Sequence, residues 1–266
     1  MDIIRIYLHS IRMLLKSRLQ YPVSFVLQTI AQLIMEGGEL MATLLLISRF
    51  NAMKQWKGPE LLLFFGVMSI TFYLTEIFGR GLTGSFSALI RNGTLDTMLL
   101  RPRGVLNQTL CQDIDPRRIG CIAVGTTAIV LGTNQLGLIW NSARLLLLAE
   151  TIICGVMLVL ALFLIEAVFS IYSVKSLEVV NVLTYGGRSA CEYPVDIFPR
   201  PIQLIFSIVA PFSLTLHVPV SCIIGKPLWG WPAWTAAVCP LAGPMALLIM
   251  WGVFRFALRH YRSTGS

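Results

Sequence analysis

The chain has 266 residues, of which 56% are apolar and only 13% are charged, and its formal net charge is +8. Soluble globular domains carry about 25% charged residues because their surface must stay solvated, so this composition excludes an ordinary soluble protein. The mean hydropathy of +0.74 instead indicates a polytopic membrane protein. We expect an all-α membrane helical bundle of about six transmembrane helices in a single domain, 1–266.

Residues 1–21 predict an amphipathic helix that lies in the membrane surface. Apolar residues from Ile4 to Leu15 recur at helical spacing, and Arg5, Arg12 and Lys16 fall on the opposite side. A helix with this pattern binds anionic headgroups through its basic face. No secretory cleavage pattern precedes the first apolar run, so we expect that run to be kept as the first span.

Apolar runs long enough to cross a membrane follow. We place spans one and two in 22–79, spans three and four in 119–171, and the last span in 233–257. Glu36-Gly37-Gly38-Glu39 interrupts the first run, and the two glycines predict a backbone that is loosened there. Glu36 and Glu39 share a helix face, which suits either a substrate pathway or a role inside the bundle.

Three other intramembrane glutamates receive different interpretations. Glu76 and Glu150 lie near the ends of their spans, so we expect them to reach the interface. Glu166 lies deeper in its span, and the sequence shows no partner for it.

The segment 172–224 allows two interpretations. In the first, 172–200 is a loop and 201–224, with Pro211 and Pro219, is a full span. In the second, 176–192 is a short polar fifth span and 201–224 is a re-entrant hairpin buried in protein. Both interpretations give six spans with the two chain ends on the same side.

Orientation follows from the basic residues. The N-terminal 21 residues, the 80–118 loop and the tail after Phe254 carry 13 of the 21 lysines and arginines, and an even number of spans places these segments on one side. The positive-inside rule assigns that side to the cytoplasm.

The sequence predicts no catalytic residue and no metal ligand. It has no phosphate-binding G-x-x-x-x-G-K-[ST] loop, no G-x-S-x-G and no H-E-x-x-H. Its six cysteines are scattered and no CxxC pair occurs, which favours small buried hydrophobic residues over zinc ligands. We therefore expect no cofactor on this chain and no enzymatic activity, and any ATP hydrolysis would belong to another chain.

The 80–103 segment predicts a short amphipathic helix or helix pair. It turns at Asn92-Gly93 and is stopped by Pro102. A leucine face flanked by arginines suits docking of a partner protein, and the alternative is that the segment lies on the bilayer.

A family resemblance rests on this segment and on a second block. The first block consists of Arg91, Gly93, Thr94, Leu95, Asp96, Leu99, Leu100, Arg101 and Pro102. The second runs from Lys175 to Asn181, then through Tyr193, Pro194, Phe198 and Pro199 to Pro211 and Pro219. Together they resemble the type-2 ABC exporter permeases, in particular a small six-span bacterial branch. The chain departs from the expected pattern in having Arg188 and Glu192 within the presumed fifth span.

The resemblance implies half of an export pathway in the bacterial inner membrane, with both termini cytoplasmic. The other half would be a second permease subunit, identical or different, and ATP and Mg would bind to an ABC ATPase subunit. The first block would couple to that ATPase, and 194–224 would form an outer gate. The residues implied for the pathway or gate are Glu36, Glu39, Tyr193, Pro194, Phe198, Pro199 and Pro211.

Three rival functions predict other features. A secondary transporter or channel driven by an ion gradient predicts paired intramembrane carboxylates and inverted repeats. An intramembrane enzyme predicts a cluster of reactive side chains at one depth. A membrane scaffold without transport predicts that the 80–103 segment is dispensable. No nucleic acid is expected as a partner, and the substrate class does not follow from the residues.

Overall fold

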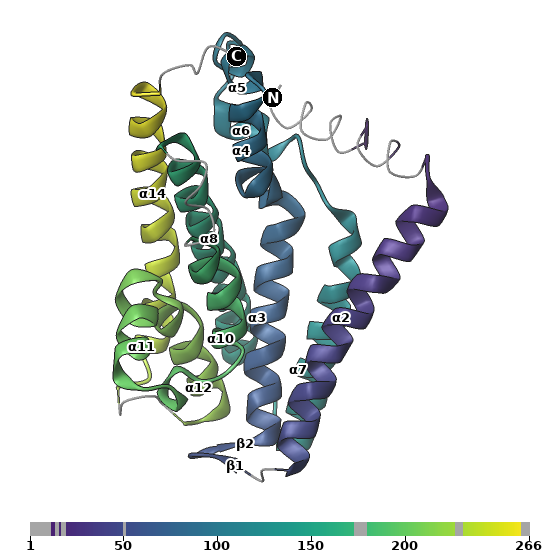
Figure 1. Cartoon of the computed structure of the whole chain (residues 1–266). Coiled ribbons are helices and arrows are strands. Elements are labelled where there is room, and N and C mark those ends of the chain that lie inside the picture. The colour runs from purple at the N-terminus through teal and green to yellow at the C-terminus, as the bar shows by residue number, and fades with distance from the viewer. Residues whose placement is uncertain are drawn as a thin grey trace.

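The computed structural model describes residues 12–13, 16, 20–49, 52–172, 180–226 and 231–261. Within them, five helical segments are long and apolar enough to cross a membrane. The principal helices of these segments are α2 (Pro22–Arg49), α3 (Gly58–Gly79), α7 (Ile119–Leu136), α8 (Ser142–Tyr172) and α14 (Ala242–Arg259). The predicted all-α polytopic bundle is thus confirmed (Figure 1). The predicted surface helix in 1–21 falls mostly outside the described residues.

Short elements connect these helices. Two-residue strands β1 (Ala52–Met53) and β2 (Trp56–Lys57) form an antiparallel hairpin between α2 and α3. Elements labelled η are short 3-10 helices, except η4, η6 and η7, which are π-helices. After α3 come η1 (Arg80–Leu82), α4 (Gly84–Arg91), α5 (Thr94–Leu99), α6 (Val105–Leu110) and η2 (Pro116–Arg118). After α8 come η4 (Val182–Gly186), α10 (Gly187–Cys191), η5 (Val195–Ile197), α11 (Arg200–Leu204), η6 (Ile205–Val209), η7 (Ser213–His217), α12 (Val218–Ile224), α13 (Thr235–Val238) and η9 (Cys239–Leu241).

The two ends of the bundle differ in their short elements. The β1–β2 hairpin, α11 and α12 gather at one end, which we call the hairpin end (Figure 1). The elements α4, α5 and α6 lie at the other, together with the last turns of α14, and we call it the elbow end. The helices 200–209 and 213–224 form a pair bent by 86°, which makes a sixth span if the pair counts as one.

α3 forms the centre of the bundle and is buried along almost its whole length. It approaches α7 so closely that a Cβ atom at Gly66 would lie 2.5 Å from the carbonyl oxygen of Gly125. The helices α8 and α14 also approach closely, because a Cβ at Gly243 of α14 would lie 2.1 Å from the carbonyl oxygen of Cys154 in α8. Small residues let transmembrane helices pack backbone against backbone, so these glycines fix the spacing of α3, α7, α8 and α14.

α2 is mostly exposed, and its buried residues are Glu36 and Thr43. Contrary to the sequence prediction, it runs without interruption through Gly37 and Gly38. A transmembrane helix satisfies its backbone hydrogen bonds within itself, which holds the glycines in helical conformation despite their low propensity. Nothing lies within 4 Å of a Cβ built at either glycine, so they are not sites of close helix contact.

A network at the hairpin end, which we call the hairpin clamp, attaches the 194–224 segment to the start of α3. Trp56 donates its indole N–H to the two carboxylate oxygens of Asp196, at 2.8 and 2.9 Å, and the Gln55 amide donates to the same carboxylate at 2.7 Å. Lys226 pairs with Glu60 at 2.7 Å. Trp56 is also 1% exposed and packs edge-on against Phe64. These contacts fasten one flank of the bent pair to the β1–β2 hairpin and the other to Glu60 at the start of α3.

Candidate functional site: a charged cavity between the spans

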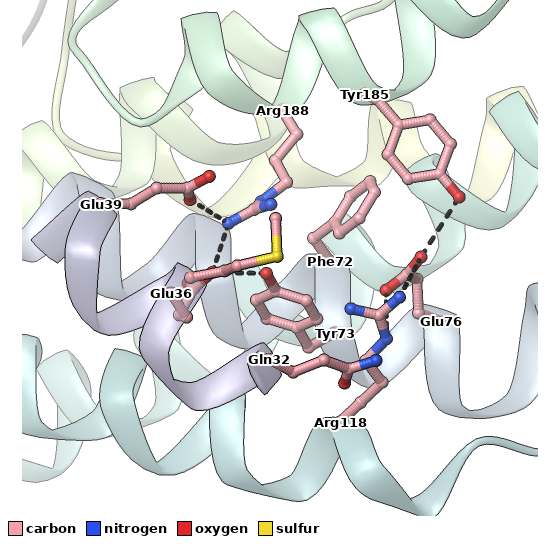
Figure 2. A pocket seen from close by; sticks show the side chains of 10 residues that line it. Gln32, Glu36, Glu39, Phe72, Tyr73, Glu76, Arg118, Tyr185 and Arg188 are labelled. Atoms are coloured by element: carbon pink, nitrogen blue, oxygen red, sulfur yellow. Dashed lines mark hydrogen bonds and ion pairs between the residues drawn. The ribbon is translucent and has the colours of Figure 1, made fainter. Parts of the chain in front are cut away.

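A cavity of about 170 Å³ lies between α2, α3, η2 and the 182–191 segment. Figure 2 shows that charged and aromatic side chains point into it from all of these elements. The lining consists of Gln32, Met35, Glu36, Glu39, Phe72, Tyr73, Glu76, Arg118, Tyr185 and Arg188.

Arg188 of α10 is the centre of the first ion network. Its Nη2 atom lies 2.7 Å from Oε2 of Glu36 and 2.7 Å from Oε2 of Glu39. Oε1 of Glu192, one helical turn later, lies 3.4 Å from the same Nη2 atom. The guanidinium also faces the ring of Tyr73, with 4.7 Å to the ring centre. The Arg188 side chain is only 10% exposed, so its charge depends on these partners rather than on water.

Glu36 receives two further hydrogen bonds from α3. Ser69 donates to Oε1 at 2.8 Å, and the Tyr73 hydroxyl donates to Oε2. Ser69 and Tyr73 are four residues apart, which puts both on the α3 face that meets α2. The carboxylate therefore has a donor on each oxygen, which compensates for its removal from water.

Glu76 and Arg118 form a second ion pair in the same cavity. Arg118 Nε lies 2.8 Å from Glu76 Oε2, and the Tyr185 hydroxyl donates to Oε1 at 3.2 Å. Glu76 is 1% exposed, so the expectation that it reaches the interface is wrong. The physical reason is that Arg118 at the start of α7 supplies the counter-charge inside the bundle.

The two networks are adjacent. Tyr73 lies between them, because its ring is faced by Arg188 and also by Arg118, with 5.4 Å from the Arg118 guanidinium to the ring centre. Phe72 stacks edge-on with Tyr185 at 5.4 Å. The cavity thus carries alternating charge over an aromatic wall, and it can hold a polar or charged group between the spans. In the described residues, no group of three or more His, Cys, Asp or Glu could hold a metal ion.

The structure separates the predicted pathway residues into two groups. Glu36 and Glu39 line the cavity. The others lie toward the hairpin end and do not line it: Tyr193, Pro194, Phe198, Pro199 and Pro211. Tyr193 connects the two groups, because its hydroxyl lies 3.4 Å from that of Thr43 on α2, and Pro211 lies at the bend between 209 and 213.

Sequence reasoning missed several residues of the cavity. Ser69, Tyr73, Arg118 and Tyr185 were not singled out, and Arg188 was noted only as a departure from the family pattern. The available signal was the energetic cost of burying Arg188, because an arginine within an apolar segment needs an acidic partner. Glu36, Glu39 and Glu166 all had no partner in the sequence, so this signal marks Arg188 without selecting its partner.

The α4–α5–α6 segment, which we call the elbow, contains the predicted coupling residues. Gly93 has φ 66°, which permits the tight turn between α4 and α5. Leu99 is 42% exposed and Leu100 is 87% exposed, while Leu95 is fully buried. Arg91, Arg101 and Pro102 are exposed, and Thr94 and Asp96 are half-buried. Leu95 therefore packs the elbow onto the bundle, and the face open to a partner consists of Leu99, Leu100 and the two arginines.

Contacts on two sides hold the elbow in place. The fully buried Asp115, which follows α6, pairs at 2.7 Å with Arg80, which precedes α4, and it also pairs with Arg117. Its backbone N–H also donates to the carbonyl oxygen of Ile77. On the other side, Tyr261 follows α14 and lies beside Asp96, and burial together with the Asp96 carboxylate raises the pKa of the Tyr261 hydroxyl. The elbow is thus linked to both α3 and α14.

Comparison with known proteins identifies a family. A family model described as "ABC-2 family transporter protein" matches residues 33–265. The match includes the elbow, the hairpin clamp and every residue of the cavity lining except Gln32. No curated protein and no solved structure matches the chain.

Proposed function

The chain belongs to the ABC-2 transporter family, and on this premise we propose that it forms half of the pathway of an ATP-driven exporter. The predicted resemblance to type-2 ABC permeases is confirmed. Membership makes the chain the multi-pass membrane component of an ABC transporter, a class that works with an ABC ATPase. Export, coupling to ATP and the arrangement of subunits belong to the proposal.

The observation that carries the proposal is the charged cavity inside the bundle. Burying Arg188, Glu36, Glu76 and Arg118 among apolar spans is costly, and such groups in membrane proteins commonly mark a pathway. Here they surround a hollow of about 170 Å³ rather than a packed interior. A cargo with polar groups can exchange contacts with these side chains as the spans move.

The other half of the pathway is a second permease subunit placed against α2. Only 11% of the most apolar window of α2 is buried within this chain, compared with 83% for the Gly58–Arg91 segment. Glu39 keeps 41% of its side chain exposed while it pairs with Arg188. A second subunit on this face covers the exposed part of the Glu39 side chain and closes the cavity, whether the two subunits are identical or different.

The elbow is the docking site for the ATPase, which binds ATP and Mg. Its exposed Leu99 and Leu100 form an apolar contact, and Arg91 and Arg101 flank it. When nucleotide draws two ATPase subunits together, the elbow transmits that movement to α3 and α14. The bent pair 200–224 acts at the other end as the outer gate, entering the membrane as a re-entrant hairpin after a short fifth span that includes 180–191.

This assignment fixes the orientation. The elbow end faces the cytoplasm of a bacterial cell, together with both termini, and the hairpin end faces outward across the inner membrane. The basic residues of the elbow agree with the positive-inside rule.

The test uses the full chain co-purified with its candidate ATPase. Leu100→Asp places a charge on the exposed elbow face, and we expect co-purification and permease-stimulated ATP hydrolysis to fall at least tenfold. Ile139→Asp is the matched control, because Ile139 is 80% exposed but lies between α7 and α8, away from the elbow. Unchanged co-purification of Leu100→Asp would refute docking at the elbow, and equal loss in both variants would show a general effect of added charge.

A further inference from the structure

A second cavity, of about 400 Å³, lies near the elbow end. It shares the Tyr185 side chain with the first cavity, so this residue contributes to the walls of both. Figure 2 shows Tyr185 with its hydroxyl directed toward Glu76. The lining consists of Arg80, Thr83, Gly84, Ser85, Glu166, Asn181 and Tyr185.

Glu166 of α8 is the unusual group in this cavity. It is 2% exposed, and its Oε2 atom has no hydrogen-bond partner in the described part of the chain. No cation of the described residues pairs with its carboxylate either, in contrast to the partners of Glu36 and Glu76. A buried carboxylate without a partner is expensive, so its position beside a hollow indicates that the partner is a ligand.

The other polar groups of the wall identify the kind of ligand. Three of its donor side chains already have partners: Arg80 donates to Asp115 at 2.7 Å, and Ser85 donates to Asp113 at 3.1 Å. Tyr185 donates to Glu76. The buried atoms that have no partner are both oxygens, Oε2 of Glu166 and Oδ1 of Asn181. The ligand must therefore donate hydrogen bonds and carry positive charge.

We propose that this cavity binds a protonated primary amine, with Glu166 as its counter-ion and Asn181 as a second acceptor. An ammonium group has three N–H donors, which suits one carboxylate, one amide oxygen and a water. One carboxylate is too few oxygen ligands for a dedicated calcium or magnesium site. The ring of Tyr185 adds an aromatic surface beside the charge. This site does not depend on the proposed export function.

The amine can come from two sources. It is either the headgroup of phosphatidylethanolamine, since the cavity lies near the elbow end of the spans, or a soluble amphipathic amine. Both offer the same ammonium group to Glu166.

The first experiment uses the purified full chain in nanodiscs of phosphatidylglycerol, a lipid without an amine. We expect hexylammonium to bind and to raise Tm, and hexanol, which has the same tail without the charge, to do neither. Glu166→Gln keeps the shape and removes the charge, and we expect at least tenfold weaker binding of hexylammonium. Glu150→Gln, in the same helix but away from the cavity, should bind as the wild type does.

Two results would overturn the proposal, and the first needs only the wild-type chain with hexylammonium and hexanol. Equal effects of hexylammonium and hexanol would show that only the tail matters, and binding that persists in Glu166→Gln would place the amine elsewhere. Native mass spectrometry in mixed phosphatidylethanolamine and phosphatidylglycerol nanodiscs then identifies the source. Retention of phosphatidylethanolamine by the wild type but not by Glu166→Gln supports the lipid, and retention by neither, with hexylammonium still bound, supports a soluble amine.

Discussion

Replacing Arg188 by Gln should destabilise the chain, because among the described residues Arg188 is the cation that pairs with Glu36, Glu39 and Glu192. Glu36 is 1% exposed and Glu192 is 7% exposed in their side chains, so neither gains full hydration when the guanidinium is lost. Glu39 is 41% exposed and can be solvated, so the cost falls mainly on the first two. Removing one partner of a buried ion pair costs about 3–5 kcal/mol.

Thermal unfolding of the purified chain in detergent measures this effect. A loss of about 3–5 kcal/mol corresponds to a fall in Tm of about 6–10 °C, at about 2 °C per kcal/mol for a chain of this size. The double variant Arg188→Gln with Glu36→Gln also removes the stranded charge, and we expect it to recover more than half of the loss. Arg255→Gln is the control, because Arg255 is exposed and loses a cation–π contact with the Trp251 ring at 4.8 Å, so its removal should change stability by less than about 1 kcal/mol.

Two results would refute this reasoning. If Arg188→Gln unfolds at the wild-type temperature, the cavity is wetter than the contacts indicate and the ion pairs carry little energy. If the double variant is less stable than Arg188→Gln alone, the stranded charge of Glu36 is not the cause of the loss.

Three further predictions follow from the packing and the hydrogen bonds. Leu95→Asp should unfold the elbow and lower Tm, whereas Leu100→Asp should leave Tm unchanged, and a thermal scan of both distinguishes packing from docking. Asp196→Asn replaces a charged acceptor of the hairpin clamp by a neutral one and should cost about 1–3 kcal/mol, measured by the same scan. Gly66→Ala should prevent folded chain from accumulating, because its Cβ would lie 2.5 Å from a backbone oxygen. Gly37→Ala has open space around it and should be neutral or stabilising by about 1 kcal/mol. A comparison of the expression level and Tm of the two variants tests both statements.

The fold class was predictable because hydropathy reports directly on burial in lipid. The runs that contain α3, α7, α8 and α14 were recognised from composition alone. The continuity of α2 was not predicted, because glycine propensities come from helices in water, where a broken backbone hydrogen bond is replaced at little cost. In lipid the same break is costly, so α2 stays helical through Gly37 and Gly38.

The charged cavity was only half predictable. Glu36 and Glu39 attracted attention because they are charged, share a face and lie within an apolar run. Arg188, however, follows Glu36 by 152 positions, and only the tertiary arrangement brings the two together. Glu76 was misassigned for the same reason. Its position near the end of α3 suggested contact with water at the interface, but it pairs with Arg118 inside the bundle. Individual buried charges can be recognised in a sequence, but their partners cannot be.

The hairpin clamp also constrains how this bundle can tilt. Asp196 is bound to the β1–β2 hairpin and Lys226 to Glu60, so both flanks of the bent pair stay with the start of α3 when the helices tilt. Because α3 packs closely on α7, the two helices tilt together, and the distance from this pivot to the elbow is the length of α3, about 33 Å for its 22 residues. A rotation of about 10° at this pivot therefore displaces the elbow by about 6 Å, which is roughly one helical turn. A small rotation at the hairpin end thus becomes a translation of about one helical turn at the elbow end. The number of residues in α3 sets the size of that translation.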